Sequence, residues 1–339
     1  MKKVISLIIV LFISVSSLSL TMTAAKETGD FVCGIWKYSV YPDHVTITGV
    51  TTPVSGKIEI PAELDGHNID YVTINDFKKN DQITEAVIGE GIEYIASSIF
   101  TGCKNLKKVT LPSTLESISC DAFLNCISLT DINIPDSLIY VEPDLFSGCT
   151  ALKEIKLPET WSEVNMRLFK GCTSLETITI PSKVRSIASS AFEGCTSLKN
   201  VYLSDGLKEI KREAFKDCTS LKQITVPSTG EEIGTIAFEG CSSLTDITLC
   251  TGLKNIYQYA FKDCTSLQEI KIPSTVKVID NYIFDGCTNL EKITLTEGVL
   301  GIGYSSFKNL TSLKSFTVPV SLDFEQKSIY PFDGCTGLT

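Results

Sequence analysis

The chain has 339 residues, of which 43% are hydrophobic and 21% are charged, and its formal net charge is −10. This composition is typical of a folded protein and excludes an intrinsically disordered one. The excess of acidic residues argues against nucleic acids and anionic membrane surfaces as partners.

Residues 1–25 are predicted to be a secretory signal peptide. Lys2 and Lys3 precede an apolar run at residues 4–15, and the segment ends in the small residues Thr23-Ala24-Ala25. The alternative is a membrane anchor. Because the apolar run is short and interrupted by serines, and no second hydrophobic segment follows, we favour cleavage and a secreted or surface-displayed protein.

Residues 26–76 are predicted to form an entry module that covers the first open coil of a repeat array. Alternating residues predict strands at 38–41 and 45–47, separated by a turn at Pro42-Asp43. A third strand is predicted at residues 58–61, where the sequence already resembles the repeat. The longer spacing that follows predicts a loop around Asp65.

Residues 77–339 form an array with a 23-residue period. A fixed period of this size is typical of a solenoid, in which each coil is one repeat. The period is marked most clearly by a phenylalanine at residues 77, 100, 123, 146, 169, 192, 215, 238, 261, 284 and 307.

Each repeat places about seven apolar residues at fixed distances from this phenylalanine. The residues six, nine and eleven positions later are apolar, as in Leu175, Ile178 and Ile180, and the alternation of the last two predicts a strand with one buried face. Proline usually follows, which ends the strand because it cannot donate to a ladder. Further apolar residues fifteen and eighteen positions after the phenylalanine, such as Val184 and Ile187, mark the return side of the coil.

The pattern LxxLxLPxxLxxIxxxAFxxCxx resembles the Treponema-type leucine-rich repeat of BspA-like bacterial surface proteins, from about residue 58 to the end. This resemblance implies a right-handed leucine-rich-repeat solenoid with a parallel β-sheet on a concave face. Short turns, helical segments and short strands are expected on the return side. It also implies display on, or release from, the cell surface, with adhesion or ligand binding as the role, and it offers no shared catalytic residues.

Thirteen cysteines would ordinarily suggest disulfides in a secreted chain. Ten of them lie three residues after a repeat phenylalanine, and Leu310 takes that place in one copy, which indicates an apolar packing column. Outside the column, Cys120 and Cys250 are six coils apart and too distant to pair. With no CxxC motif and only His44 and His67 as histidines, neither a metal site nor a cofactor is predicted.

No set of residues indicates an active site, so we predict a non-enzymatic protein. Two alternatives stay open: the non-catalytic repeat region of a larger surface hydrolase whose other domain is missing, and a structural spacer.

The last copy departs from the period, because Phe332 follows Phe307 by 25 residues (332 − 307) and no strand follows it. We expect either a truncated sequence or another chain over that end.

A partner-binding patch is predicted on the outward positions of three central strands. There the eighth position after the phenylalanine is uncharged, and Tyr202 is the one aromatic residue at the tenth. The expected partner is a protein or glycoprotein, either host extracellular matrix or another cell-surface protein. The convex side and the entry module around Trp36 are the alternative surfaces. The predicted patch consists of Thr177, Thr179, Asn200, Tyr202, Gln223 and Thr225.

Overall fold

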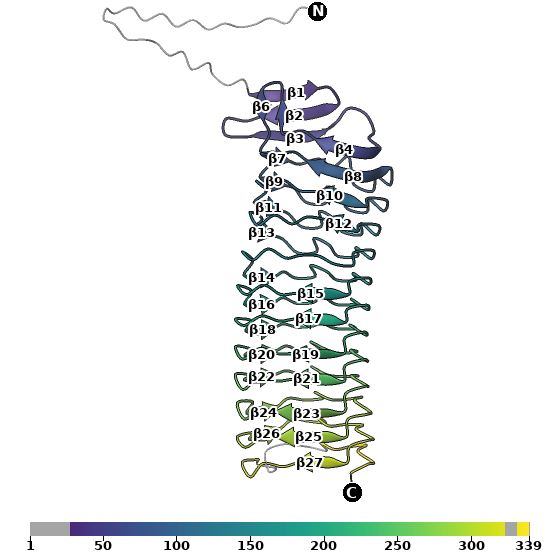
Figure 1. Cartoon of the computed structure of the whole chain (residues 1–339), viewed down its shortest axis with the longest axis vertical. Helices are drawn as coiled ribbons and strands as arrows, with labels where there is room; N and C mark the ends of the chain where they lie inside the picture. The colour runs from purple at the N-terminus through teal and green to yellow at the C-terminus, as the bar shows by residue number, and fades with distance from the viewer. Residues whose placement is uncertain (1–27, 323–330, 339) are drawn as a thin grey trace, which may run out of the picture.

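The computed structural model describes residues 28–322 and 331–338, so the predicted signal peptide lies outside the described residues. Strands and turns make up these two ranges, and neither contains a helix. Figure 1 shows one column of stacked coils with the entry module at its amino-terminal end. The column is nearly straight in this view, so its two sheets are named below by their strands rather than as concave and convex faces.

The entry module is an antiparallel sheet that continues into the solenoid. The predicted strands are confirmed as β2 (Trp36–Val40) and β3 (Val45–Val50), which pair with each other. An additional strand, β1 (Gly29–Cys33), pairs with β2. On its other edge, β3 pairs in parallel with β7 (Tyr71–Val72), which begins the column of short strands.

The remaining strands of this module form a second connection to the array. The predicted strand at residues 58–61 is β4 (Gly56–Ile60), which pairs in parallel with β8 (Ile83–Ile88), the first strand of the array on that side. The predicted loop is a small hairpin of β5 (Glu63–Leu64) and β6 (His67–Asn68). The buried Tyr38 hydroxyl donates a hydrogen bond to Asp65 at 2.8 Å. Burial and this carboxylate raise the pKa of Tyr38 to about 12.

The coils of the array contribute strands to two parallel sheets, and only the coil of Phe146 lacks a strand in the first of them within the described residues. The long-strand face carries β8 (Ile83–Ile88), β10 (Lys108–Thr110), β12 (Asp131–Ile132), β15 (Thr177–Thr179), β17 (Asn200–Tyr202), β19 (Gln223–Thr225), β21 (Asp246–Thr248), β23 (Glu269–Ile272), β25 (Lys292–Leu295) and β27 (Ser315–Thr317). The short-strand face carries β9 (Tyr94–Ile95), β11 (Ser117–Ile118), β13 (Tyr140–Val141), β14 (Glu163–Val164), β16 (Ser186–Ile187), β18 (Glu209–Ile210), β20 (Glu232–Ile233), β22 (Asn255–Ile256), β24 (Val278–Ile279) and β26 (Gly301–Ile302).

Neither sheet is continuous along the column. The long strands pair in four groups, β4-β8-β10-β12, β15-β17, β19-β21 and β23-β25-β27. The short strands pair continuously up to β13, then from β14 to β22, and finally as β24-β26. Both sheets therefore stop pairing at two levels, the coil of Phe146 and the step from β21 and β22 to β23 and β24.

A stack of phenylalanine rings forms the centre of the core. The eleven periodic phenylalanines are fully buried, and neighbouring rings are stacked with centroids 5.2 to 6.0 Å apart. The predicted inward positions of the same coils are also buried, as Leu175, Ile178, Ile180 and Val184 illustrate. One coil cannot bury these side chains alone, so each coil is stable only when stacked on its neighbours.

The third side of each coil is a turn column with its own hydrogen-bond ladder. Around Phe100, the amides of Ser98, Phe100 and Gly102 donate to carbonyl oxygens 22 residues later, at 3.0, 2.9 and 2.7 Å. The same ladder crosses the coil of Phe146, where both sheets stop pairing. From the coil of Phe100 to that of Phe307, the residues two positions before and two positions after the phenylalanine have positive φ, a conformation that glycine, asparagine and aspartate tolerate best.

The column cysteines pack as predicted and also make a contact that the sequence did not reveal. All thirteen cysteines are free, and nine of the ten in the column are buried. Each buried thiol donates to the phenylalanine carbonyl of the preceding coil, as from Cys195 to Phe169 at 3.1 Å. Burial raises the pKa of Cys103 to about 11 and raises that of Cys149 well above its ordinary value.

Candidate binding surface

The structure places the predicted patch on three neighbouring strands of the long-strand face. Thr177 and Thr179 on β15 lie in register with Asn200 and Tyr202 on β17, and the Asn200 amide donates to the Thr177 hydroxyl at 3.3 Å. β19, which carries Gln223 and Thr225, lies next to β17 but forms ladder bonds only with β21. The main chain thus brings all six residues onto one face.

The alternation of these strands turns the patch side chains outward. Ile178 and Val201 point into the core at 1% and 8% exposure, whereas Tyr202 is 58% exposed. Charge lies at the margin of the patch, where Lys199 and Glu176 form an ion pair at 2.9 Å. The patch therefore presents hydroxyl, amide and phenol groups, which cost less to desolvate than charges do.

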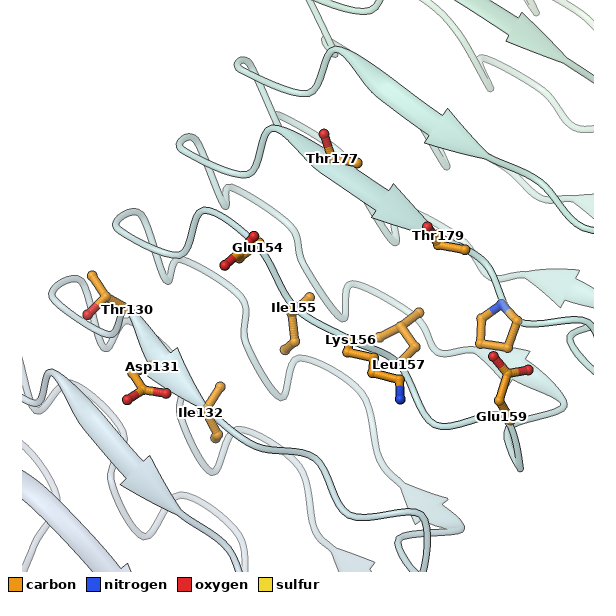
Figure 2. A pocket seen from close by; sticks show the side chains of 11 residues that line it. Thr130, Asp131, Ile132, Glu154, Ile155, Lys156, Leu157, Glu159, Thr177 and Thr179 are labelled. Carbon is orange, nitrogen blue, oxygen red and sulfur yellow. The ribbon is translucent and has the colours of Figure 1, made fainter.

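A cleft of about 580 Å³ adjoins this patch at the coil of Phe146, and it was not predicted from the repeat pattern. It runs from β12 across residues 154–157 to β15, so Thr177 and Thr179 belong to both the patch and the cleft. Figure 2 shows Asp131, Glu154 and Thr177 on three successive coils, with Lys156, Thr179 and Glu159 farther along the same coils.

Residues 154–157 form no strand, although the corresponding segment of every other coil between Phe77 and Thr317 does. Neither their amides nor their carbonyl oxygens form a backbone hydrogen bond with β12 or β15. As a result, Ile132 and Ile155 are only half-buried, whereas Val109 and Ile178 at equivalent positions are 1% exposed. The cleft therefore combines an apolar floor with main-chain groups that have no ladder partner.

Trp161 provides a physical reason for the interruption on the short-strand face. It occupies the column that holds leucine or valine in most other coils, and it is 4% exposed. Its indole nitrogen donates to the Leu138 carbonyl at 2.7 Å. A ring of this size between the coils separates β13 from β14, because the interior is close-packed elsewhere. A tryptophan in an aliphatic column is the sequence signal that would have located this coil.

The two histidines do not form a catalytic or metal-binding constellation. His44 is stacked on Tyr41 with ring centroids 4.5 Å apart and meets Tyr71 edge-on at 4.7 Å, and its ring hydrogen-bonds Asp43 at 2.8 Å. His67 lies 6.2 Å from the ring of Tyr38. Within residues 28–322 and 331–338, no three His, Cys, Asp or Glu side chains are grouped closely enough to hold a metal ion.

Residues 28–322 and 331–338 contain no helix of the length and hydrophobicity that crossing a bilayer requires.

Comparison with known families identifies one match that spans most of the array. A family model described as a BspA-type leucine-rich repeat region of six copies matches residues 70–199, 118–235 and 208–339. Together these ranges run from residue 70 to residue 339, well over half of the chain. None of the proteins of curated function is significantly similar to this sequence.

Two bacterial proteins of solved structure have a similar fold. A leucine-rich repeat protein from Bacteroides ovatus is 22% identical, with a TM-score of 0.70, and the match covers 91% of this chain and 93% of that one. The pneumococcal vaccine antigen PcpA is 21% identical, with a TM-score of 0.59 and coverage of 87% and 82%. At these identities the likeness shows the fold, which is a leucine-rich-repeat solenoid.

Proposed function

Because this chain belongs to the family of BspA-type leucine-rich repeat regions, we propose that it is a non-catalytic binding module that acts outside the cell. Its role would be to bind a protein or glycoprotein through the long-strand face. The observation that carries the proposal is the exposed Tyr202 in an uncharged strip of ordered strands. Aromatic residues with a polar tip are enriched at protein interfaces because they bury a large area at low entropic cost.

The extracellular location rests on the sequence. The predicted signal peptide at residues 1–25 and the resemblance to bacterial surface proteins both support secretion or surface display. Host extracellular matrix or another cell-surface protein is the partner class that this location favours. Catalysis forms no part of the proposal, because a repeat scaffold binds through many outward side chains rather than through one reactive group.

The test begins with immobilised extracellular-matrix and cell-surface proteins, from which a ligand is chosen by dose-dependent binding. Tyr202→Ala should then weaken binding by about 1–2 kcal/mol, the cost of removing an interface anchor. The thermal midpoint should be unchanged, since the ring points away from the core. The measurement is the Kd of both proteins by surface plasmon resonance.

The matched control is Tyr259→Ala, which removes the same ring from the turn column. Tyr259 is stacked on Tyr282 at 5.0 Å and is remote from the long-strand face, so binding should be intact. If both variants bind the ligand as tightly as the parent does, the patch around Tyr202 is wrong. The entry module around Trp36 would then be tested next.

A further inference from the structure

A second cleft lies on the short-strand face, where β13 and β14 do not pair. Its volume of about 280 Å³ is just below the range of roughly 300–1,000 Å³ that is usual for drug-sized ligands, so it suits one small ring. It extends over three successive coils, from β11 across β13 to β14. Its lining includes one aromatic ring and five polar side chains, from Tyr140, Ser117, Glu142, Ser162, Glu163 and Asn165.

Tyr140 provides an apolar wall of this cleft. The residue is 65% exposed, more than any other aromatic residue in the part of the chain that the structure describes. Ser117 lies beside it in register on the preceding coil and is too small to cover the ring. On the following coil, the Glu163 carboxylate is drawn toward later coils, because its Oε1 accepts hydrogen bonds from Ser186 at 2.7 Å and from Lys211 at 2.9 Å. The ring of Tyr140 is therefore available for packing against a ligand.

Three polar side chains of the cleft are held in place by one atom and present another. The Glu142 Oε2 accepts a hydrogen bond from the Cys120 amide at 3.0 Å. The Asn165 Nδ2 donates to the Val141 carbonyl at 2.7 Å. The other oxygen of each group, Glu142 Oε1, Asn165 Oδ1 and Glu163 Oε2, forms no hydrogen bond with the described residues. These three acceptors are thus positioned before a ligand arrives.

Hydrogen-bond donors line the same cleft. The Arg185 amide donates to the Ser162 carbonyl at 2.8 Å, but the Ser162 amide has no such acceptor on the coil before it. The hydroxyls of Ser117 and Ser162 also form no hydrogen bond with the described residues. An ammonium ligand would use only the acceptors of this cleft, whereas a sugar hydroxyl both donates and accepts. The mixture of donors and acceptors therefore favours a polyhydroxylated ligand.

We propose that this cleft binds one pyranose ring of a neutral glycan, with the C–H face of the sugar packed on Tyr140. Neighbouring sugar hydroxyls would donate to Glu142, Glu163 and Asn165. A pyranose has a face of C–H groups and a rim of hydroxyls, so it matches both the apolar wall and the polar lining. This assigns a second ligand to the other sheet and does not depend on the function proposed for the long-strand face.

The other break in the short-strand face shows that missing strand pairing alone does not make such a site. Between β22 and β24, Asn255 and Val278 occupy the positions that Tyr140 and Glu163 occupy here (255 − 140 = 278 − 163 = 115 = 5 × 23). That break therefore lacks both the aromatic wall and the carboxylate.

The experiment uses the full chain and the methyl glycosides of glucose, galactose, mannose, fucose and N-acetylglucosamine, with choline as a cationic probe. Saturation-transfer difference NMR identifies the probes that bind, and titration gives their Kd values. The best glycoside should bind with a Kd of about 1 mM, and choline about tenfold more weakly. Raising NaCl from about 50 mM to about 500 mM should change the Kd of the glycoside less than about twofold, because a neutral sugar forms no ion pair.

Variants locate the binding. Tyr140→Ala should weaken binding of the best glycoside about tenfold, whereas Tyr140→Phe keeps the ring and should stay within about threefold of the parent. Ser162→Trp fills the cleft from an exposed position and should abolish binding. The controls are Tyr257→Ala, an exposed tyrosine five coils along the same face, and Tyr202→Ala on the long-strand face. Both should bind the glycoside as the parent does.

Several results would overturn the glycan site. They are the absence of binding for every glycoside, equal binding by the parent and Tyr140→Ala, and equal binding by the parent and Ser162→Trp. Loss of binding in Tyr257→Ala or Tyr202→Ala would place the sugar elsewhere on the molecule. Tighter binding of choline than of any glycoside, weakened by salt, would assign the cleft to an organic cation instead.

Discussion

Phe192 shows how much of the stability depends on single core residues. Its side chain is fully buried, and its ring lies 5.5 Å from that of Phe169 and 5.2 Å from that of Phe215. Phe192→Ala should lower the free energy of unfolding by about 3–5 kcal/mol, since it removes a stacked ring and leaves a cavity between coils. Chemical denaturation of parent and variant measures this difference, and a loss below about 1 kcal/mol would contradict the stacked core.

The buried thiols make stability depend on alkaline pH. In the unfolded chain a thiol loses its proton near its ordinary pKa, whereas the pKa of folded Cys103 is raised to about 11. The folded state therefore binds the proton more tightly. The stabilisation that this tighter binding provides is complete at pH values below the pKa of the thiol in the unfolded chain. It is lost as the pH rises toward the pKa of the thiol in the folded protein.

Cys103→Ala isolates this effect from the titration of lysine and tyrosine. The variant should be less stable than the parent at pH about 7. The difference in stability should shrink at pH about 10.5, because only the parent contains the Cys103 thiol and loses its proton-linked stabilisation there. Thermal melts at both pH values give the two differences. An equal difference at both values would show that the thiol does not titrate differently in the two states.

At the scale of single residues, periodicity predicts packing but not polar contacts within the column. The identities of Phe192 and Cys195 at fixed spacing were enough to place both in the core. The bond from Cys195 to the Phe169 carbonyl could not be predicted, because it depends on how one coil is offset from the next. The left-handed turn positions did leave a signal, since glycine, asparagine or aspartate usually stands two residues after each phenylalanine.

At the scale of elements, the strands were predictable and the interruptions were not. Alternation identified β15, β17 and β19 correctly, and these strands carry the predicted patch. Residues 154–157 have the same alternation, Glu-Ile-Lys-Leu, yet they form no strand. Whether such a segment pairs depends on how it packs against the neighbouring coils, which the pattern of a single coil cannot represent.

The separation of β13 from β14 is expected to respond to Trp161. In Trp161→Leu the aliphatic column is restored, so the two strands should approach and pair as β14 and β16 do. The amides of residues 140–142 and 163–165 should then exchange with deuterium about tenfold more slowly, in proportion to the added free energy of opening. Hydrogen-exchange mass spectrometry tests this.

The control for this substitution is Leu207→Ile, in the same column but within the continuous sheet from β14 to β22. It should leave exchange near β13 and β14 unchanged, because it alters shape at nearly constant volume far from that coil. Unchanged or faster exchange at residues 140–142 in Trp161→Leu would mean that the indole is not what holds these strands apart.

At the scale of the whole molecule, the uneven sheets make the column an elastic rod of uneven stiffness. Where both sheets stop pairing, at the coil of Phe146, the turn ladder and the phenylalanine stack still cross the gap. A rod that is continuous along one edge and open along two others bends most easily about the continuous edge. The stretch from β14 to β22, where the short strands pair without a break, should behave as a stiffer arm.

Distances between pairs of nitroxide labels would reveal this bending. Labels at Glu116 and Lys208 span four coils across the gap (208 − 116 = 92 = 4 × 23), and labels at Ser162 and Lys254 span four coils within the stiffer arm (254 − 162 = 92). All four positions are exposed. The first pair should give the broader distance distribution. The solenoid would then consist of two stiff segments that bend relative to each other at the coil of Phe146. The angle between these segments would determine how large or how curved a partner surface the molecule can contact.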